Sequence, residues 1–399
     1  MSRILYFITR YENSSDVYGG EKSTITTARL SRDLGHDVHF IVTGADAIVS
    51  ELGAAGLSFE VIPIWNPIDG VRRAPLRGKW RRLVRIAEAN RGVYTICKRR
   101  GIDVVHANGV PALLYSWLGT KLAGAKVTFH IRDLSKRRTL RWYETLSVLC
   151  ADRTLVISPS LREALLAGAP VILERALARR MQTLYNAIDF GPIDDYIARR
   201  SREDARHELG LSIGDQFAVL VGSVDARKGQ LRVIEQVLPE VLASVPSLKL
   251  LLAGGGKDSG YERACRAAVA RLGVAHAVRW LGYLPFAELM RVYRAADVAL
   301  VASESEGLSR AAVEAHGFGL PVITTAIPGP VDVVRDGETG FHVPNDHIEQ
   351  MAPRLTQLLR DPDLAGRMGR AGAEAVRSRF APEIHRRAIG AVYAELSRR

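Results

Sequence analysis

The chain has 399 residues, of which 47% are hydrophobic and 25% are charged. This balance excludes a disordered or collagen-like chain, and the length favours two domains of about 190 residues each. Residues 1–190 hold 28 Lys and Arg against 17 Asp and Glu, whereas residues 191–399 hold 27 against 26. The first half therefore carries nearly all of the formal net charge of +12, which predicts an anionic partner there: lipid headgroups, a phosphorylated substrate or nucleic acid.

The three cysteines, Cys97, Cys150 and Cys265, lie far apart and show no C-x-x-C spacing. This pattern argues against a disulfide framework or a structural zinc site and favours a reducing compartment. No apolar run reaches about 18 residues, so we expect no membrane-spanning helix. The apolar stretch at the start is too short for a signal peptide, and we expect a cytoplasmic protein.

Short apolar runs alternate with longer helical patterns along the chain. Strands are expected in the first half at residues 3–9, 38–43, 59–64, 103–107, 126–131 and 154–158, with an early helix over residues 21–35. Strands are expected in the second half at residues 217–222, 248–254, 278–281, 298–302 and 321–325. This alternation predicts two doubly wound, Rossmann-like α/β domains, hinged near residues 190–212 where the pattern loosens. Because such sheets bind ligands beyond the carboxyl ends of their strands, two facing sheets would place a site in a deep cleft between them.

A glycine-containing loop follows the strand expected at residues 217–222. Its sequence is VGSVDARKGQ, residues 221–230. Glycine permits a phosphate to approach the backbone, a helix start offers free N–H groups, and Lys228 adds a positive charge. The alternative is an ordinary β–α turn with solvated basic residues. The glycine run at residues 254–256 lacks G-x-G-x-x-G spacing, so we expect only a tight turn that lines a nucleotide site.

Two glutamates separated by seven residues form the strongest motif, SESEGLSRAAVEA, residues 303–315. Glu306 is expected on the loop after a strand, and Glu314 about a turn and a half into the helix that begins near Ser309. A loop carboxylate can accept hydrogen bonds from sugar hydroxyls, and a helix carboxylate can accept them from a ribose diol. The N–H groups of residues 308–310 would then face a diphosphate. The alternative is a helix whose first turn simply favours acidic residues.

These motifs resemble those of retaining GT-B glycosyltransferases of the Glu-x7-Glu group, glycosyltransferase family 4. The resemblance runs through the chain in order: YGGE (18–21), LGHDV (34–38), VVHAN (104–108), TFH (128–130), VISPS (156–160), YNAID (185–189), RKG (227–229), LGY (281–283), the glutamate block, GLPVI (319–323) and GETGF (337–341). It implies a GT-B fold with an acceptor domain over residues 1–190 and a nucleotide-sugar domain over residues 191–381. A last helix over residues 382–399 would pack back on the first domain.

The resemblance also implies roles for individual residues. His130, Lys228 and Glu306 would be catalytic: Lys228 binds the donor diphosphate, Glu306 the donor-sugar hydroxyls, and His130 lies near the transferred sugar. The remaining donor-binding candidates are Gly20, Ser223, Arg227, Tyr283, Gly307, Leu308, Ser309, Arg310 and Glu314. The acceptor-side candidates are Gly19, His106, Asn108 and Arg132. Ser223 stands where the family usually has arginine, so Arg227 or Arg310 would replace the lost charge.

The implied reaction is a retaining transfer that needs no metal and no other cofactor. The leaving nucleoside diphosphate would be stabilised by Lys228 and backbone dipoles, and the acceptor hydroxyl would attack from the same face. No D-x-D metal motif is present in the chain, and neither carboxylate need serve as a nucleophile.

The segment at residues 72–85, RRAPLRGKWRRLVR, predicts an amphipathic helix with one strongly basic face. Trp80 between arginines suits a membrane interface, and residues 136–143 are also basic. The alternative is an ordinary helix packed on its own sheet with a solvated basic face. Because both stretches fall in the acceptor domain, we favour contact with an anionic membrane surface and a lipid-linked acceptor.

The prediction is therefore a glycosyltransferase that uses a nucleoside-diphosphate sugar and a lipid-linked or glycan acceptor. By family association, its pathway is cell-surface polysaccharide or glycolipid biosynthesis, at the inner face of the plasma membrane. One alternative is a GT-B-type sugar-nucleotide epimerase, which the ordered glutamate block disfavours. A less favoured alternative is a basic nucleic-acid-binding protein, for which no recognised reading motif is present.

Overall fold

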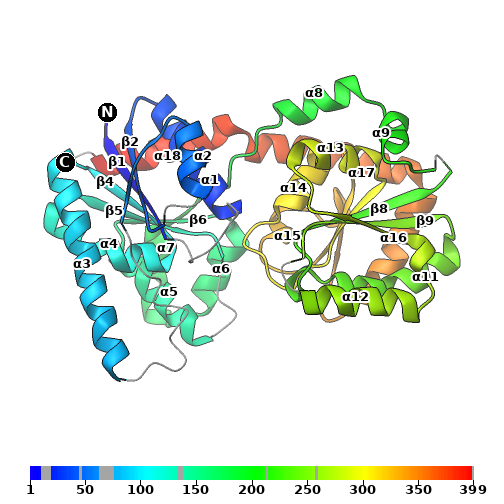
Figure 1. Ribbon diagram of the computed structural model, residues 1–399, viewed down its shortest axis with the longest axis horizontal. Coiled ribbons are helices and arrows are strands. Elements are labelled where there is room, and N and C mark those ends of the chain that lie inside the picture. The colour runs from blue at the N-terminus through cyan, green and yellow to red at the C-terminus, as the bar shows by residue number, and fades with distance from the viewer. Residues whose placement is uncertain are drawn as a thin grey trace. The chain divides into compact units, whose positions relative to one another are not determined.

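The computed structural model describes residues 1–9, 19–44, 47–62, 76–133, 138–212, 214–256 and 259–397, apart from the side chains of 76–82, 138–142 and 259. The chain divides into two compact units (Figure 1). Unit 1 consists of Met1–Ile188 together with Pro382–Arg399, and unit 2 of Asp189–Ala381. The last segment of the chain thus belongs with the first unit.

Unit 1 is built on a parallel sheet whose strand order is β3-β2-β1-β4-β5-β6-β7. The strands are β1 (Arg3–Ile8), β2 (Asp37–Val42), β3 (Ser58–Val61), β4 (Val104–Asn108), β5 (Lys126–Ile131), β6 (Arg153–Val156) and β7 (Met181–Thr183). The central strands are buried along nearly their whole length, which explains why they appear in the sequence as continuous apolar runs. The strand order reverses between β1 and β4. Asn108 ends β4 and Arg132 directly follows β5 at the carboxyl edge of the sheet.

Helices connect these strands and cover the sheet. They are α1 (Gly19–Asp33), α2 (Ala47–Ala54), α3 (Leu76–Arg100), α4 (Val110–Ala123), α5 (Arg138–Cys150), α6 (Pro159–Ala167), α7 (Val171–Arg180) and the final α18 (Pro382–Ser397). Helices α1, α2 and α18 enclose one core with β1 and β2, to which α18 contributes Ile389, Val392 and Tyr393. Helices α3 and α4 pack on each other, and α4 also lies against β4 and β5.

Unit 2 repeats this architecture with a parallel sheet in the order β10-β9-β8-β11-β12-β13. The strands are β8 (Gln216–Val221), β9 (Leu248–Ala253), β10 (Val278–Gly282), β11 (Val298–Val301), β12 (Val322–Thr325) and β13 (Gly340–Val343). The order reverses between β8 and β11, which are hydrogen-bonded neighbours. Two doubly wound, Rossmann-like units are the fold that the sequence predicts.

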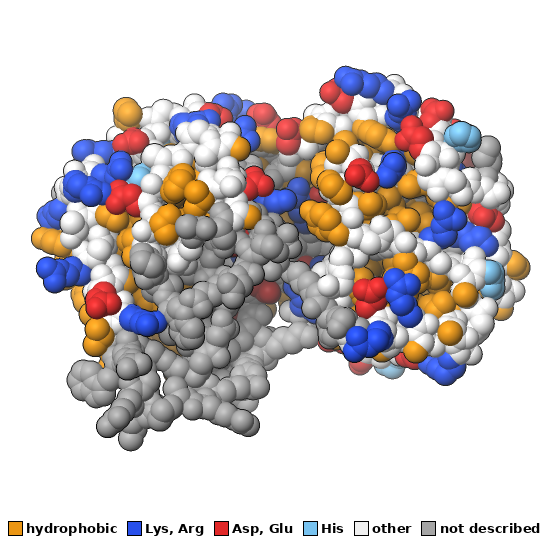
Figure 2. Space-filling view, viewed as in Figure 1, with side chains coloured by type: hydrophobic (Ala, Val, Ile, Leu, Met, Phe, Trp, Pro, Cys, Tyr) orange, Lys and Arg blue, Asp and Glu red, His pale blue; other side chains and the backbone are white. Residues whose placement is uncertain are grey.

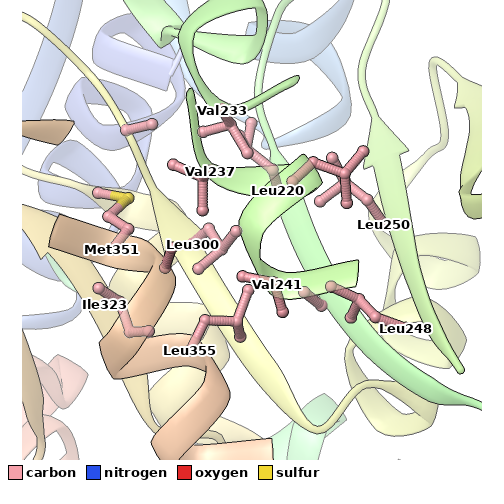
Figure 3. Close-up of a cluster of buried hydrophobic side chains, with 14 of the residues drawn as sticks. Leu220, Val233, Val237, Val241, Leu248, Leu250, Leu300, Ile323, Met351 and Leu355 are labelled. Atoms are coloured by element: carbon pink, nitrogen blue, oxygen red, sulfur yellow. The ribbon is translucent and has the colours of Figure 1, made fainter. Parts of the chain in front are cut away.

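The helices of unit 2 are α8 (Gly191–Arg199), α9 (Arg202–Glu208), α10 (Gln230–Arg232), α11 (Leu238–Ser244), α12 (Ser259–Arg271), α13 (Phe286–Ala295), α14 (Arg310–Gly317), α15 (Pro330–Val333), α16 (Met351–Arg360) and α17 (Pro362–Phe380). Short 3-10 turns lie at Ala226–Lys228, Ala275–Ala277 and Ile348–Gln350. A π-helical turn, Val233–Val237, joins α10 to α11 just before Pro239, which has no N–H for an α-helical bond. Figure 3 shows Val233, Val237 and Val241 of this stretch packed with Leu220 and Leu300 of the sheet.

The strands that the sequence analysis missed, β7 and β13, lie at the edges of their sheets. Each is three or four residues long and pairs on one side only, so neither needs a long apolar run. The expected loosening over residues 190–212 is also corrected: α8 and α9 occupy most of it and belong to unit 2. Both helices pack against α13, and this tertiary contact fixes them in a stretch whose sequence pattern is too short to predict them.

Basic and acidic side chains are interspersed on both units over the face that Figure 2 shows. Residues 76–85 of the basic segment form the start of α3, residues 72–75 lie outside the described residues, and only the last three side chains of the segment are described. Of these, Leu83 and Val84 are exposed. The expected basic face of this helix therefore stays a prediction.

We predict that the packing of α18 is a main source of stability in unit 1. Ile389 is fully buried on this helix, whereas Ile384 of the same helix is 41% exposed. Ile389→Ala should lower the free energy of unfolding by about 2–5 kcal/mol, because it leaves a cavity in the core. The matched variant Ile384→Ala should lower it by about 1 kcal/mol or less. Urea-induced unfolding followed by circular dichroism measures both, and equal losses would contradict the prediction.

Candidate active site

Lys228 and Glu306 form an ion pair at the carboxyl edge of the unit 2 sheet. Lys228 follows β8 and Glu306 follows β11, on either side of the point where the strand order reverses. The side chains are only 17% and 10% exposed, and Ser303 Oγ donates a second hydrogen bond of 2.9 Å to Glu306 Oε1. The structure thus brings together two residues that the sequence analysis assigned to the donor diphosphate and the donor sugar.

Close backbone approaches surround this pair. The methylene stem of Lys228 runs over Gly222, where an added Cβ would lie 3.2 Å from Lys228 Cδ and Cε. Gly229 has φ +74°, and a Cβ there would lie 2.1 Å from the carbonyl oxygen of Ala302. Glycine at 229 therefore permits the β8 loop to approach the end of β11, which places Lys228 against Glu306.

Ser223 and Arg227 flank Lys228 on the β8 loop. Ser223 Oγ donates a 2.6 Å hydrogen bond to Asp225 Oδ2, and Arg227 Nε lies 3.9 Å from Asp225 Oδ1. Arg227 is 40% exposed and is therefore the more accessible partner for an anion on this loop. Neither residue is held in the core of the unit, so both can turn toward a ligand.

Glu314 is buried on α14 and both of its carboxylate oxygens have partners. Arg310 Nε donates to Oε1 at 2.6 Å, and Tyr293 OH donates to Oε2 at 3.1 Å. Tyr293 stacks on Phe318, with ring centroids 5.5 Å apart. Burial raises the pKa of Tyr293 well above its usual value, so its hydroxyl stays a donor. Arg310 and Glu314 were predicted from the glutamate motif, whereas Tyr293 was not, because no local motif marks it.

The remaining donor-side candidates lie on neighbouring loops of the same edge. Ser309 caps α14, with its hydroxyl accepting from Ala312 N, while Gly307 is buried and Leu308 half-buried. Tyr283 follows β10 and is 72% exposed, with its Cβ 3.4 Å from the Cβ position of Gly255. The run at residues 254–256 therefore lies beside Tyr283.

In unit 1, Arg132 joins three strand ends. Its Nε donates to Asn108 Oδ1 at 2.7 Å, another guanidinium nitrogen donates to Asn186 Oδ1, and Nη2 lies 3.2 Å from His130 Nδ1. Asn108 is the last residue of β4, His130 lies in β5 and Asn186 follows β7. The structure therefore brings together His130, Asn108 and Arg132. Asn186 was not predicted as a site residue, although it lies in the YNAID motif, residues 185–189.

His106 continues this group into the core. Its Nε2 lies 3.1 Å from His130 Nδ1 and its Nδ1 lies 2.9 Å from Tyr393 OH of α18. Gly19 and Gly20 begin α1, and a Cβ at Gly20 would lie 3.5 Å from Arg132 Cδ. Gly20 is therefore next to this arginine, whereas no contact places Gly19 there. His106 and His130 are both fully buried, and His106 lies between His130 and Tyr393.

Burial governs the protonation of these groups. It lowers the pKa of His106 to about 3 and the pKa of His130 well below its usual value, and the charge of Arg132 lowers both further. The pKa of Arg132 is lowered to about 9, mainly by burial, so the guanidinium stays charged at neutral pH. His130 is therefore a neutral imidazole beside a cation.

Among the described residues, no group of three or more His, Cys, Asp and Glu side chains is arranged to hold a metal ion. Nor does any helix in the described part of the chain have the length and hydropathy needed to cross a membrane.

Two family models match successive parts of the chain. "Glycosyl transferase 4-like domain" matches residues 19–176, and "Glycosyl transferases group 1" matches residues 201–375. The chain belongs to the group 1 glycosyltransferases. The second match contains both glutamates, Lys228 and Tyr283, and the first contains His106, His130 and Arg132.

Curated relatives of this chain carry the name D-inositol 3-phosphate glycosyltransferase. The protein of Nocardia farcinica is 36% identical over 210 residues, which is 50% of this chain and 46% of the relative. That of Segniliparus rotundus is 35% identical over 169 residues, 42% of this chain and 37% of the relative. The matched region thus spans less than half the length of these relatives.

Solved structures share the fold over almost the whole chain. A glycosyltransferase from Rickettsia africae has a TM-score of 0.81 at 19% identity, with 99% of this chain and 98% of that one covered. HepE of Anabaena, solved in complex with UDP, has a TM-score of 0.79 at 18% identity, with 99% and 100% covered. Both units of the GT-B fold are therefore shared with these proteins.

We predict that mild acid destabilises unit 1 through its buried neutral histidines. Burial lowers the pKa of His106 to about 3 and of His385 to about 4, below the value of about 6.5 in the unfolded chain. Below pH 6.5 the unfolded state binds protons that the folded state does not. The free energy of unfolding is therefore highest above pH 6.5 and falls as the pH is lowered toward 4. Each histidine should remove about 2 kcal/mol between pH 7.5 and pH 5. Urea unfolding at the two pH values measures this, and an unchanged midpoint would contradict it.

Proposed function

We propose that this protein transfers a sugar from a nucleoside-diphosphate sugar to an acceptor hydroxyl. The observation that carries the proposal is the Lys228–Glu306 pair at the carboxyl edge of a doubly wound sheet, where such folds bind nucleotides. A donor diphosphate would compete with Glu306 for the ammonium of Lys228 and free the carboxylate to accept bonds from sugar hydroxyls. HepE of Anabaena was solved with UDP and with UDP-glucose, which supports a uridine nucleotide as the first donor to test.

We propose further that the transfer retains the configuration of the sugar and needs no metal. Lys228, with Arg227 or Arg310 in place of the arginine missing at Ser223, would stabilise the leaving diphosphate electrostatically. Both arginines are 40% or more exposed and can reach a ligand. The acceptor hydroxyl would then attack the face that the diphosphate leaves, with a phosphate oxygen taking its proton. Glu314, held by Arg310 and Tyr293, would accept bonds from the ribose.

The proposed acceptor is a lipid-linked or glycan hydroxyl in the assembly of cell-surface polysaccharide or glycolipid. The basic surplus of residues 1–190 favours an acceptor that carries phosphate, and Arg132 is a cation at the strand ends of this unit. The names of the curated relatives support a phosphorylated polyol as a second acceptor to test.

We predict that Lys228→Ala and Glu306→Ala each abolish sugar transfer and leave the fold intact. Loss of Lys228 removes the charge that stabilises the leaving group, and loss of Glu306 removes the contact to the sugar. The matched control is Glu304→Ala, because Glu304 is a carboxylate on the same loop that is 38% exposed and lies 4.0 Å from Arg232 instead. It should keep most of the activity.

The experiment is a panel of sugar nucleotides ranked by thermal shift, followed by a turnover assay with the best donor and a set of acceptors. The stereochemistry of the product and activity in the presence of a chelator test the retaining, metal-free part of the proposal. Near-normal turnover by both alanine variants would refute the site. An isomerised sugar nucleotide formed without acceptor would instead support the epimerase alternative.

We propose that unit 1 also contacts an anionic membrane. Helix α4 exposes Leu114, Trp117, Leu118 and Leu122 at spacings of three and four residues, which places them along one face. Leu122 is 66% exposed. An exposed apolar row in the half of the chain that carries the surplus of +11 combines the two features of an interfacial helix.

We predict that the protein floats with vesicles that contain anionic lipid and not with neutral vesicles. Leu118→Glu should reduce flotation, because it adds a negative charge to the exposed apolar row. The control Leu113→Met alters a buried side chain of the same helix and should leave flotation unchanged. Equal binding to neutral and anionic vesicles, or none, would contradict the proposal.

A further inference from the structure

The guanidinium of Arg132 carries a positive charge whose partners are all neutral. Its three hydrogen bonds go to Asn108 Oδ1, Asn186 Oδ1 and His130 Nδ1. The two amides carry no charge, and burial keeps the pKa of His130 well below its usual value, so this imidazole is neutral as well. Among the described residues, no Asp or Glu side chain forms an ion pair with Arg132.

A guanidinium that is withdrawn from water normally meets a carboxylate. Arg206 of unit 2 does so, since Asp297 accepts two hydrogen bonds from it at 2.9 and 2.8 Å. Arg132 lacks such a partner within the described part of the chain, and burial lowers its pKa to about 9. A charge held in this way destabilises the fold, so an anion that binds beside it is stabilising.

Arg132 also fixes the orientation of the two asparagines. A guanidinium can only donate, so each asparagine must direct its amide oxygen toward Arg132 and its NH2 group away from it. Neither NH2 group meets an acceptor among the described residues, and both asparagines are half-buried. Arg132 keeps two further N–H groups beyond its three bonds. The guanidinium is therefore surrounded by additional hydrogen-bond donors.

These three residues lie where parallel sheets bind ligands. Asn108 ends β4, Arg132 directly follows β5 and Asn186 follows β7, so all three lie at the carboxyl edge of one sheet. All three belong to unit 1, and the group is complete without any residue of unit 2.

We propose that Arg132, Asn108 and Asn186 form an anion site within unit 1, and that this site binds a phosphate group of the acceptor. A phosphate has three or more oxygens that accept hydrogen bonds, and a guanidinium matches it with two parallel N–H groups. The surplus of +11 in residues 1–190 favours a doubly charged ligand. The assignment to the acceptor rests on the proposed function, whereas the binding of phosphate does not.

The first test is a titration with inorganic phosphate, with chloride at equal ionic strength as the reference anion. It is carried out in a Lys228→Ala background, so that Lys228 of unit 2 contributes no binding. The side-chain NH2 signal of Asn108, observed by ¹⁵N nuclear magnetic resonance and assigned through Asn108→Ser, should shift and saturate with phosphate but not with chloride.

The deciding variant is Asn186→Asp, because it retains Arg132 and places a carboxylate on its guanidinium. It should weaken phosphate binding about 10-fold or more, since the added carboxylate competes with the anion. Its thermal midpoint should not fall, because the buried cation gains a partner, and this distinguishes lost binding from unfolding. The matched control is Asn345→Asp, since Asn345 of unit 2 is also half-buried and accepts a 3.1 Å hydrogen bond from Arg232. It should leave phosphate affinity unchanged.

The second test uses the otherwise unaltered chain and each acceptor found active, soluble or lipid-linked, with and without its phosphate. Removal of the phosphate should raise KM for the acceptor about 10-fold or more in the parent chain and have little effect in Asn186→Asp. The soluble and the lipid-linked acceptor then show separately which of them supplies the phosphate.

The outcomes separate the site from the proposed function. No saturable shift with phosphate would overturn the site, as would equal affinity of the parent and Asn186→Asp or an equal loss in Asn345→Asp. Acetate bound as tightly as phosphate would overturn the choice of phosphate. If phosphate binds as expected but no sugar transfer is found, the proposed function fails and the anion site stands. Equal KM values with and without the phosphate would overturn the assignment to the acceptor.

Discussion

Lys228 and Glu306 are 78 residues apart in the chain, yet they form an ion pair, because β8 and β11 are adjacent parallel strands whose following loops leave the sheet at the same edge. Other parts of unit 2 hold Lys228 and Glu306 next to each other. Glycines at 222 and 229 permit the approach of the β8 loop, and the apolar packing of Figure 3 holds the two strands beneath it. A charge pair with so little exposure is costly unless it is well bonded, and Ser303 supplies part of that bonding.

Unit 1 uses the same topology for a different kind of polar group. Its strand ends carry one guanidinium and a neutral imidazole, rather than a preformed ion pair. Arg132 cross-links the ends of β4, β5 and the segment after β7, and thereby determines which nitrogen of His130 can donate. Unit 2 thus carries an ion pair at the carboxyl edge of its sheet, while unit 1 carries a guanidinium beside a neutral imidazole at its own.

Some features of the site could be predicted because short stretches of the sequence encode them. The glutamate pair, the lysine loop and the TFH strand end each lie within a dozen residues, and the apolar runs of buried parallel strands are easily found. The edge strands β7 and β13 were missed because three or four half-paired residues carry no periodic signal. Tyr293 and Tyr393 were missed for another reason. A single tyrosine on a helix gives the same sequence pattern whether it only fills the core or also forms a hydrogen bond to a polar side chain of the site.

By itself, the sequence determined the order of strands and helices, the family and most of the polar residues at the strand ends, since these depend on hydrophobic periodicity and short motifs. The tertiary structure alone decided the partners: that Glu314 is shared by Arg310 and Tyr293, and that the last helix returns to unit 1 to join Tyr393 to His106. Those contacts span up to 287 residues, and side chains so distant meet only when the sheet and its covering helices have packed.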